Sequence, residues 1–352
     1  MCTGGVGMSR GSPYANKSVL VTGGSGFIGT HLAQRLAHAG ARVVGMSRSP
    51  QSHAGAPAPI SYVAGDVRDE AAVASLVGTR FDYIFHLAAY SGQVPGFADH
   101  EQSLTTNCLG LLNVLDAVRR LSPATVLCFP SSRLVYGRPQ YLPVDEEHPA
   151  VPLSLYGVHK RACEEYCAYY GVRWGIRTAV VRLANPYGPH RAAAHNRYNV
   201  ANWMIDEVVH GGQVTIFGRG AQLRDYVYID DAVDAMLAVA PDERAYGRVY
   251  NVGSGVGVPL VEFARAAMAL AGSGSFRFAP WPDDHLRVET GDFAAGISRI
   301  RDEIGWSPRV SLRAGLAATI AAQRRTLHRA GRARPASEPA TTAIDTAMRE
   351  AA

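Results

Sequence analysis

The sequence contains no apolar run close to the ~20 residues that a membrane-spanning helix needs, and its start lacks the pattern of a cleavable signal peptide. We therefore expect a cytoplasmic protein without a membrane partner. Cysteine is scarce as well: Cys2, Cys108, Cys128, Cys163 and Cys167 form an odd set without Cys-x-x-Cys spacing. Neither a disulfide framework nor a metal site is predicted.

Charge of either sign is also modest. Charged residues make up 18% of the chain and the formal net charge is +5, whereas hydrophobic residues reach 47%. At 352 residues, this is the composition of a globular protein with a substantial core. The positive balance suits a small anionic ligand. No motif for binding nucleic acid is present, so a nucleic-acid partner is not predicted.

Short β-branched or aromatic runs alternate with helix-length amphipathic segments. The predicted strands are SVLVTG, ARVVGM, ISYVAG, FDYIFHLAA, ATVLCFPSS and IRTAVVRLAN, and the predicted helices include GTHLAQRLAHAG, DEAAVASLV, NCLGLLNVLDAVRRL and SLYGVHKRACEEYCAYYG. This alternation calls for parallel strands joined by right-handed crossovers. The predicted fold class is α/β, a doubly wound parallel (Rossmann) sheet with a smaller C-terminal substrate-binding lobe.

Four regions are predicted along the chain. Residues 1–15 are expected to be a disordered leader, and residues 332–352 a disordered tail rich in Ala, Pro, Ser and Thr. Residues 16–185 form the dinucleotide-binding Rossmann domain, to which later segments return. Residues 186–331 form mainly the substrate-binding lobe, which includes isolated strands such as VTIFG and RVYNVG.

A glycine-rich turn, TGGSGFIG, follows the first predicted strand and opens a helix. Gly23, Gly26 and Gly29 are three residues apart, the spacing of a dinucleotide-binding turn. Gly23 allows the tight turn, Gly26 allows close approach of a pyrophosphate, and Gly29 lets the helix pack near the strand. Backbone N–H groups near Phe27 and Ile28 are expected to point at the phosphates. The alternative is a glycine-rich turn without a ligand.

The end of the second predicted strand bears on which dinucleotide binds. NAD-binding proteins usually place an acid there, on the ribose hydroxyls, whereas this chain has Ser47 and Arg48. An arginine can pair with the 2′-phosphate of NADP. The cofactor is predicted to be NADP or NAD, with NADP favoured; the alternative for Arg48 is a solvated loop charge.

Two further strand ends are predicted to contact the cofactor. GDVRD ends the third strand, with Asp66 as an acceptor for the adenine amino group and Val67 beside it. The alternative for Asp66 is an ordinary turn residue. Leu87, Ala88 and Ala89 end the fourth strand, where small side chains leave room for a flat ring and a ribose.

The predicted chemistry depends on Ser132, Tyr156 and Lys160. Tyr156 and Lys160 are four residues apart, so on a helix they share a face, and Ser132 ends the preceding strand. The phenol is predicted to exchange a proton with a substrate oxygen, beside the cofactor, while Lys160 stabilises the phenolate of a group whose pKa is near ~10 in water. Ser132 is predicted to bind the same substrate oxygen. The alternative for Tyr156 and Lys160 is a core aromatic residue with a solvated neighbour.

In these motifs and their order the chain resembles the extended short-chain dehydrogenase/reductases of the NAD-dependent epimerase/dehydratase family, which act on nucleotide sugars. The resemblance covers about residues 19–322. It is carried by TGGSGFIG, SSRLVYG, YGVHK, RLANPYGP, RDYVYIDD, YNVGSG and GWSPRVSLRAGL. It implies a nucleotide-diphosphate sugar as substrate, and a homodimer formed through the helices that contain LLNVLDAVRR and GVHKRACEEYCAYY.

The resemblance also implies roles for four single residues. Asn185 is expected to contact the sugar diphosphate, Arg224 and Arg287 to bind its phosphates, and Asn107 to lie on a helix beside the cofactor. Two arginines suit a diphosphate because guanidinium groups make charge-assisted hydrogen bonds. From the residues alone, Asn185 is equally a turn residue, and Arg224 is equally the partner of a nearby aspartate.

The chain departs from the family pattern at Arg133 and Leu134, where dehydratases and decarboxylases usually carry a carboxylate. A dehydratase is therefore disfavoured. Two activities remain, both with hydride transfer at sugar C4: reduction of a 4-keto nucleotide sugar, slightly favoured because of Arg48, and 4-epimerisation with tightly bound NAD. A dinucleotide sensor without catalysis is the third alternative, although a sensor has no need of the Ser–Tyr–Lys set.

Overall fold

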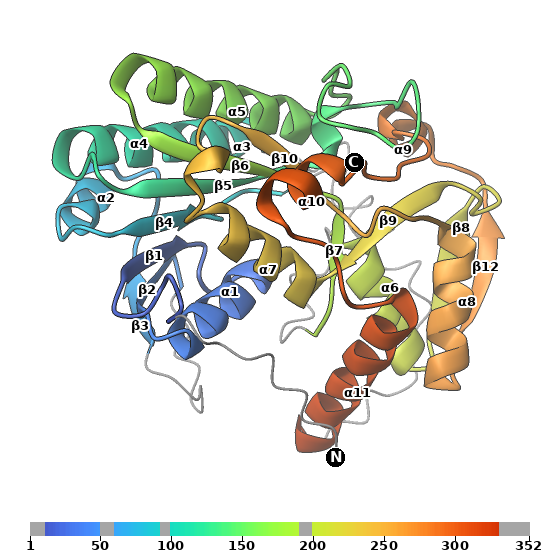
Figure 1. The fold of residues 1–352 in the computed structure, drawn as a ribbon. Helices are drawn as coiled ribbons and strands as arrows, with labels where there is room; N and C mark the ends of the chain where they lie inside the picture. The colour runs from blue at the N-terminus through green and yellow to red at the C-terminus, as the bar shows by residue number, and fades with distance from the viewer. Residues whose placement is uncertain (1–10, 50–59, 92–98, 190–198, 331–352) are drawn as a thin grey trace.

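A computed structural model describes residues 11–49, 60–91, 99–189 and 199–330. Its centre is a seven-stranded parallel sheet with the order β10-β6-β5-β4-β1-β2-β3 (Figure 1). The first six strands in the chain are β1 (Ser18–Thr22), β2 (Arg42–Ser47), β3 (Ile60–Ala64), β4 (Tyr83–His86), β5 (Val126–Ser132) and β6 (Arg177–Leu183). This order confirms the predicted Rossmann fold. The strand order reverses between β1 and β4, where such sheets bind ligands.

Helices cover both faces of this sheet. One face carries α1 (Phe27–His38), α7 (Ile229–Val239) and α10 (Ser298–Ile304), and the other carries α2 (Glu70–Val77), α3 (His100–Leu104), α4 (Gly110–Leu121) and α5 (Leu155–Trp174). Within β1, Val19 and Val21 belong to the apolar core on the α1 side, whereas Leu20 belongs to the core on the α4 side. This alternation explains why the strands are apolar throughout. Within the described residues, no helix is long and apolar enough to span a membrane.

The strand predicted at RVYNVG lies in the main sheet and not among the isolated strands of the lobe. It forms β10 (Val249–Val252), which pairs with β6 and completes that edge of the sheet. The lobe has two small sheets of its own. They consist of β7 (Asn185–Tyr187), β9 (Leu223–Tyr228) and β11 (Gly257–Pro259), and of β8 (Gln213–Phe217) and β12 (Ser275–Ala279).

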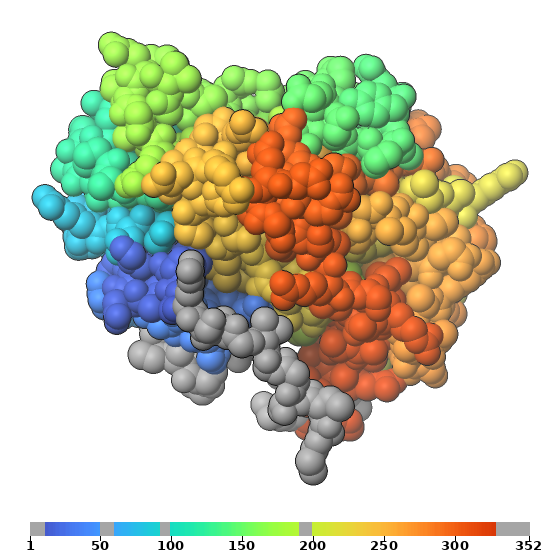
Figure 2. Space-filling view, viewed as in Figure 1, coloured from blue at the N-terminus to red at the C-terminus, as the bar shows by residue number. Residues whose placement is uncertain are grey.

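The helices of the lobe pack mainly on one another. They are α6 (Val200–Val209), α8 (Leu260–Ala271), α9 (Asp283–Val288) and α11 (Leu312–Ala330), and α6, α8 and α11 are in mutual contact. In Figure 2 the gold and red-orange segments that include α7 and α10 lie between the blue and green first half of the chain and this lobe. The C-terminal half therefore contributes to both parts of the molecule.

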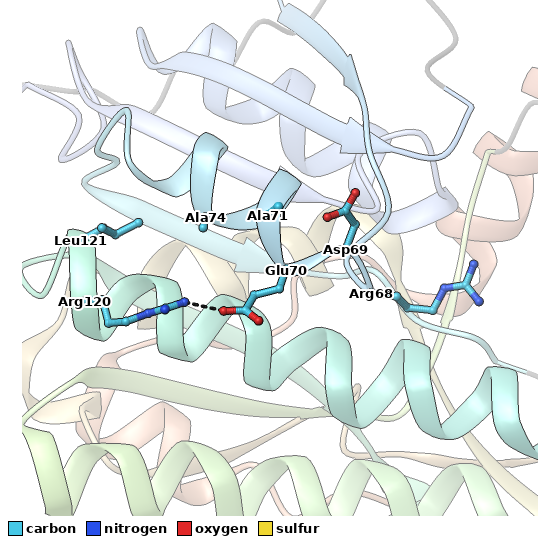
Figure 3. Close-up of a pocket in the computed structure, with 7 residues that line it drawn as sticks. All are labelled: Arg68, Asp69, Glu70, Ala71, Ala74, Arg120 and Leu121. Atoms are coloured by element: carbon cyan, nitrogen blue, oxygen red, sulfur yellow. Dashed lines mark hydrogen bonds and ion pairs between the residues drawn. The ribbon is translucent and has the colours of Figure 1, made fainter.

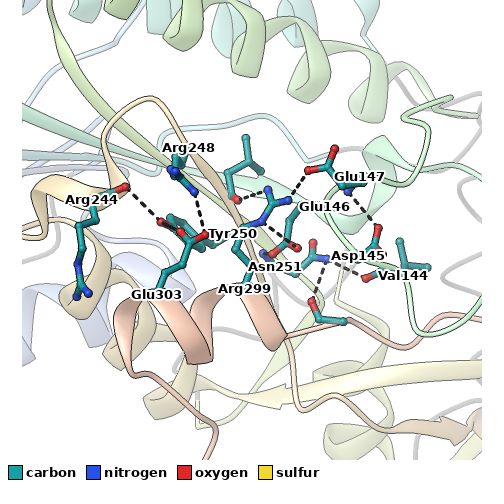
Figure 4. A network of polar contacts seen from close by, with 12 residues as sticks. Val144, Asp145, Glu146, Glu147, Arg244, Arg248, Tyr250, Asn251, Arg299 and Glu303 are labelled. Carbon is teal, nitrogen blue, oxygen red and sulfur yellow. Dashed lines mark hydrogen bonds and ion pairs between the residues drawn. The ribbon is translucent and has the colours of Figure 1, made fainter.

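A polar network fastens β10 to the segment that follows β5 (Figure 4). Asn251 of β10 donates from Nδ2 to the Val144 carbonyl oxygen over 2.9 Å, and its backbone N–H donates to Glu146 Oε1 over 2.7 Å. Arg299 of α10 lies 3.7 Å from the Glu146 carboxylate. The Tyr136 hydroxyl donates to Asn251 Oδ1 over 2.7 Å. The network thus fixes the chain just beyond the predicted serine strand.

Ordered structure begins earlier than the sequence analysis predicted. Tyr14, which the analysis placed in a disordered leader, is only 2% exposed. Its ring lies 5.1 Å from that of Tyr83, and its hydroxyl donates to the Leu237 carbonyl oxygen over 2.9 Å. The prediction was therefore wrong for residues 11–15, because one buried aromatic side chain anchors them. Residues 1–10 of the predicted leader and the predicted tail, 332–352, lie outside the described residues.

Candidate active site

The glycine turn leaves no room for side chains. Gly23 has a φ of +69°, and a Cβ atom there would lie 2.8 Å from the Ala88 backbone nitrogen. A Cβ atom on Gly29 would collide with the Gly23 carbonyl oxygen. Gly26 is the N-cap of α1 and offers no side chain to cap the helix, which begins at Phe27 and continues through Ile28. A glycine turn followed by a helix N-terminus without a side-chain cap leaves backbone N–H groups accessible, and a dinucleotide pyrophosphate fits such a site.

The end of β2 presents one unsatisfied polar atom. Ser47 Oγ is buried, and it has no hydrogen-bond partner among the described residues. A buried hydroxyl is normally paired, so this atom fits a ligand such as a ribose hydroxyl. Arg48, the next residue, is exposed.

Asp66, the predicted adenine acceptor, is engaged by a neighbour. Arg68 Nε lies 3.1 Å from Asp66 Oδ1, and Arg68 Nη2 lies 2.6 Å from Asp66 Oδ2. These hydrogen bonds lower the pKa of the Asp66 carboxyl, against its partial burial. Val67 is buried, and its carbonyl oxygen accepts from Asn113 Nδ2 over 2.9 Å. An adenine amino group would have to share Asp66 with Arg68.

The segment after β4 is held in place from both sides. The Leu87 N–H donates to the Thr22 carbonyl oxygen over 3.1 Å, and the Ala88 N–H donates to Thr22 Oγ1 over 3.2 Å. Asn107 is 2% exposed; its Oδ1 accepts from the Tyr90 N–H over 2.8 Å, and its Nδ2 donates to the Tyr90 carbonyl oxygen over 3.0 Å. Asn107 therefore holds the backbone of Tyr90, the residue after Ala89, and both polar atoms of its amide are used in these hydrogen bonds.

Asn107 lies in a π-helical turn, Thr105–Leu109, just before α4. Such turns often occur at functional positions. The sequence analysis took this segment as part of an ordinary helix, since the composition of a π turn carries no distinct signal.

Lys160 lies deep in the site on α5. It is 4% exposed, and its Nζ donates to the Pro130 carbonyl oxygen of β5 over 2.7 Å. The same nitrogen lies 4.4 Å from the centre of the Phe129 ring and 5.7 Å from that of the Tyr156 ring. Burial lowers the pKa of Lys160 to about 8. The ammonium group is thus fixed between β5 and the phenol.

Ser132 and Tyr156 belong to the same two elements, β5 and α5, that hold this lysine. Ser132 ends β5, where its Oγ accepts from the Leu134 N–H over 3.3 Å and caps the short 3-10 helix Arg133–Val135. Tyr156 is in the first turn of α5, which Ser154 caps by accepting from the Gly157 N–H. Burial raises the pKa of Tyr156. Without a bound ligand, the phenol is therefore protonated at neutral pH. The decrease in its pKa that we expected from Lys160 is smaller than the increase caused by burial.

A buried ion pair joins the elements that carry the candidate catalytic residues, and the sequence analysis did not anticipate it. Glu164 of α5 receives hydrogen bonds from Arg182 Nε (2.9 Å) and Arg182 Nη2 (2.6 Å) of β6, and from Ser131 Oγ (2.5 Å) of β5. The side chains of Glu164 and Arg182 are 2% and 4% exposed. Three elements are thus joined one residue from Ser132. The only sign of this contact in the sequence was a second serine, Ser131, directly before Ser132.

Two of the predicted substrate residues, Asn185 and Arg224, lie close together in the lobe. Asn185 accepts at Oδ1 from Arg133 Nε over 3.2 Å, and its Nδ2 donates to the Asp225 carbonyl oxygen over 2.8 Å. Arg224 donates from Nη1 to the Gly291 carbonyl oxygen over 2.7 Å.

The ionic partner of Arg224 is Glu289, and not the nearby aspartate that the sequence left open. Asp225 is fully buried and accepts from Ser254, Gly255 and Ala295. Arg287 is exposed on α9 and has no ionic partner among the described residues. The structure thus brings Asn185 and Arg224 together and leaves Arg287 at the surface.

A separate surface depression lies between α2 and α4 (Figure 3). Arg120 and Glu70 form a salt bridge of 2.8 Å across it, and Arg68 lies at its other end. None of the predicted catalytic residues lines it. This hollow is therefore not the candidate active site.

Comparison with known proteins settles the family. The sequence profile of the NAD dependent epimerase/dehydratase family matches residues 19–253. The chain belongs to this family. It is therefore an enzyme of the NAD-dependent nucleotide-sugar epimerase/dehydratase type, and the matched region contains the glycine turn, β5, α5 and the Arg224 strand.

Members of the family from other organisms are similar over most of their length. A UDP-glucose 4-epimerase from Mycolicibacterium smegmatis is 31% identical, over 86% of this chain and 96% of that protein. The structure of the UDP-glucose 4-epimerase from Thermotoga maritima with UDP-glucose is 27% identical, with a TM-score of 0.79, over 88% of this chain and 99% of that one. The UDP-glucuronic acid 4-epimerase from Bacillus cereus, in complex with UDP-glucuronic acid and NAD, is 26% identical, with a TM-score of 0.77, over the same shares.

The glycine turn can be tested directly. Gly29→Ala is expected to weaken NAD binding by about 10–100-fold, because the new methyl group meets the Gly23 carbonyl oxygen and overpacking of this kind costs about 1–3 kcal/mol. Calorimetric titration with NAD measures the change. Gly11→Ala is the matched control, since a Cβ atom there has nothing within 4 Å. Equal affinities for both variants would contradict the assignment of this turn to the cofactor.

Proposed function

We propose that the protein is a nucleotide-sugar 4-epimerase that uses bound NAD. The observation that carries the proposal is the position of Lys160 Nζ, 2.7 Å from the Pro130 carbonyl oxygen and 5.7 Å from the Tyr156 ring centre. It supports a site in which Tyr156 and β5, the strand that ends at Ser132, lie close to one ammonium group. The relatives that are named 4-epimerases support epimerisation over the keto-sugar reduction that the sequence slightly favoured.

The residues of the turn and strand ends would hold the cofactor. Gly23, Gly26 and Gly29 admit the pyrophosphate, and the buried Ser47 hydroxyl suits a ribose oxygen. When bound, NAD takes up a hydride from a sugar carbon and returns it. Asn107 keeps the segment after β4 in place, and the small side chains of that segment would leave room for the cofactor ring.

Tyr156 would move the proton at the C4 oxygen of the sugar. It accepts the hydroxyl proton as the ketone forms, and it donates a proton back when the hydroxyl reappears. Lys160 is mostly protonated at neutral pH, because its pKa of about 8 lies above that value. Its charge favours the phenolate against the effect of burial. Ser132 would donate a hydrogen bond to the same oxygen and hold it near the phenol.

Arg48 favours a second candidate, reduction of a 4-keto nucleotide sugar by NADPH. The residue is exposed at the end of β2, where an acid would repel a 2′-phosphate. The two functions differ in their cofactor balance. An epimerase ends each turnover with the oxidised cofactor it began with, whereas a reductase consumes one NADPH for each product.

The decisive assay follows this difference. Purified enzyme with NAD is expected to interconvert UDP-glucose and UDP-galactose, or the dTDP-linked pair, without net change of absorbance at the NADH band. Chromatography of the sugar nucleotides measures the product. Stoichiometric loss of NADPH with a 4-keto sugar nucleotide, and no interconversion with NAD, would establish the reductase instead.

We also propose that two copies pair through the outer face of α5. Helix α5 lies at the outer edge of the molecule (Figure 1). It exposes Leu155, Val158, Tyr169 and Val172, which lie three, eleven and three residues apart and thus on one side of the helix. Val172 is 92% exposed. A row of exposed apolar side chains on one helix is typical of an interface.

Charge on this face is expected to separate the copies. The double variant Tyr169→Asp, Val172→Asp should sediment as a monomer under conditions in which the parent is a dimer, because two carboxylates would be buried at the interface. Val256→Asp is the control, since Val256 is 60% exposed and lies outside α5. An identical sedimentation coefficient for all three proteins would refute the proposed pairing.

A further inference from the structure

Arg133 is a buried cation next to the catalytic serine. It directly follows Ser132 and begins the 3-10 helix Arg133–Val135. Only 9% of the residue is exposed. In the sequence analysis this position is a departure from the family pattern, in which dehydratases and decarboxylases usually carry a carboxylate. Its presence therefore requires an explanation from the structure.

The partners of Arg133 are all neutral. Its Nε donates to Asn185 Oδ1 over 3.2 Å, its Nη1 donates to Thr290 Oγ1 over 2.9 Å, and its Cζ lies 5.3 Å from the centre of the Phe293 ring. Among the described residues, no carboxylate forms an ion pair with Arg133 and no acceptor binds its Nη2. Nη2 is also not sealed in the protein, unlike the buried unpaired Nη1 of Arg182. Nη2 is therefore the part of the guanidinium group that remains free to bind a ligand.

The two nearby carboxylates are committed elsewhere. Glu289 pairs with Arg224, and Asp225 accepts hydrogen bonds from Ser254, Gly255 and Ala295. Burial, together with the nearby charge of Arg224, lowers the pKa of Arg133 to about 9. A buried guanidinium group without a counter-ion is unfavourable. An anion on the substrate would relieve this cost.

We propose that Arg133 binds a carboxylate on the sugar ring, which makes a nucleotide hexuronic acid the preferred substrate. The inference deepens the proposed function and depends on it. Ser132 would hold the reacting oxygen, and Arg224 would bind the diphosphate. Arg133 touches Asn185 beside Arg224 and is bonded to Ser132 through the chain, so it lies between these two points. A guanidinium group there faces the substituents of the ring, and it matches a carboxylate with two hydrogen bonds.

A phosphate oxygen is the other anion in reach, and the experiment separates the two. Kinetics with UDP-glucuronic acid and UDP-glucose measure the preference for the carboxylate, and calorimetric titration with UDP measures the phosphate contacts alone. We expect the parent to favour UDP-glucuronic acid in kcat/KM. Arg133→Met should lower kcat/KM for UDP-glucuronic acid by about 10–100-fold, the range of hydrogen bonds between charged groups, and leave the affinity for UDP unchanged.

Two further variants serve as controls for Arg133→Met. Arg133→Lys keeps the charge and should retain part of the preference, whereas Arg138→Met removes an exposed arginine five residues away and should retain all of it. A parent that favours UDP-glucose, or an Arg133→Met variant that loses UDP affinity as strongly as it loses activity, would overturn the proposal. The parent's preference decides the matter even where Arg133→Met fails to fold.

Different results would overturn the role of Arg133 and the proposed function. Turnover of UDP-glucose with no preference for the uronic acid would overturn the role of Arg133 alone. An enzyme that converts neither substrate nor their dTDP counterparts would overturn 4-epimerisation itself.

Discussion

Tyr156→Phe is expected to lower turnover of the nucleotide sugar by about 10²–10⁴-fold, the range that general acid–base groups contribute. The substitution removes one hydroxyl and leaves the ring that lies 5.7 Å from Lys160 Nζ. Affinity for NAD should stay within about twofold, because the glycine turn and the ends of β2 and β4 are untouched. Single-turnover kinetics and calorimetric titration with NAD measure the two effects.

Tyr166→Phe provides the matched control for this experiment. Tyr166 is on the same helix, ten residues further on, and it packs partly buried against the core on the α4 side. Its loss of a hydroxyl should change turnover less than about threefold. If both variants were equally active, Tyr156 would not be the proton-transfer group and the proposed chemistry would fail.

Glu164→Gln is expected to lower the free energy of unfolding by about 3–5 kcal/mol, the usual cost of removing one member of a buried ion pair. The variant keeps the size of the side chain but leaves the Arg182 guanidinium buried without a carboxylate. Ser131 also loses a charged acceptor. Urea unfolding followed by circular dichroism measures the change.

Glu165→Gln is the control for Glu164→Gln, because it makes the same chemical change one residue along α5. The Glu165 side chain is 59% exposed, and its one ionic partner among the described residues is Arg161. Exposed pairs contribute about 0–1 kcal/mol, so the control should stay near the parent. Similar losses in the two variants would show that burial of the Glu164–Arg182 pair is not important for stability.

Local signals in the sequence predicted the frame of the site well. The glycine spacing predicted the turn, and alternating apolar runs predicted six strands close to where β1 to β6 lie. Tyr156 and Lys160 share a helix whose start is capped by Ser154, so their proximity follows from a spacing of four residues. These features depend on neighbours in the chain, which is why the sequence reveals them.

Contacts between distant segments could not be predicted in this way. Tyr14 is buried against residues around position 83 and position 237, and Arg224 pairs with Glu289, 65 residues away. The strand in RVYNVG, which is β10, would have the same apolar pattern in a lobe as in the main sheet. Arg133 was visible only as a departure from the family pattern, and its neutral surroundings depend on residues 185, 290 and 293.

The pairing of β10 with β6 has a consequence for biosynthesis. While the ribosome is still making the residues between Leu183 and Val249, the backbone hydrogen-bonding groups along the outer edge of β6 have no partner strand. An uncovered edge of this kind readily pairs with another chain. A nascent or truncated protein that stops before residue 249 should therefore be more prone to aggregate, and the full-length chain closes that edge only after most of the lobe has been synthesised.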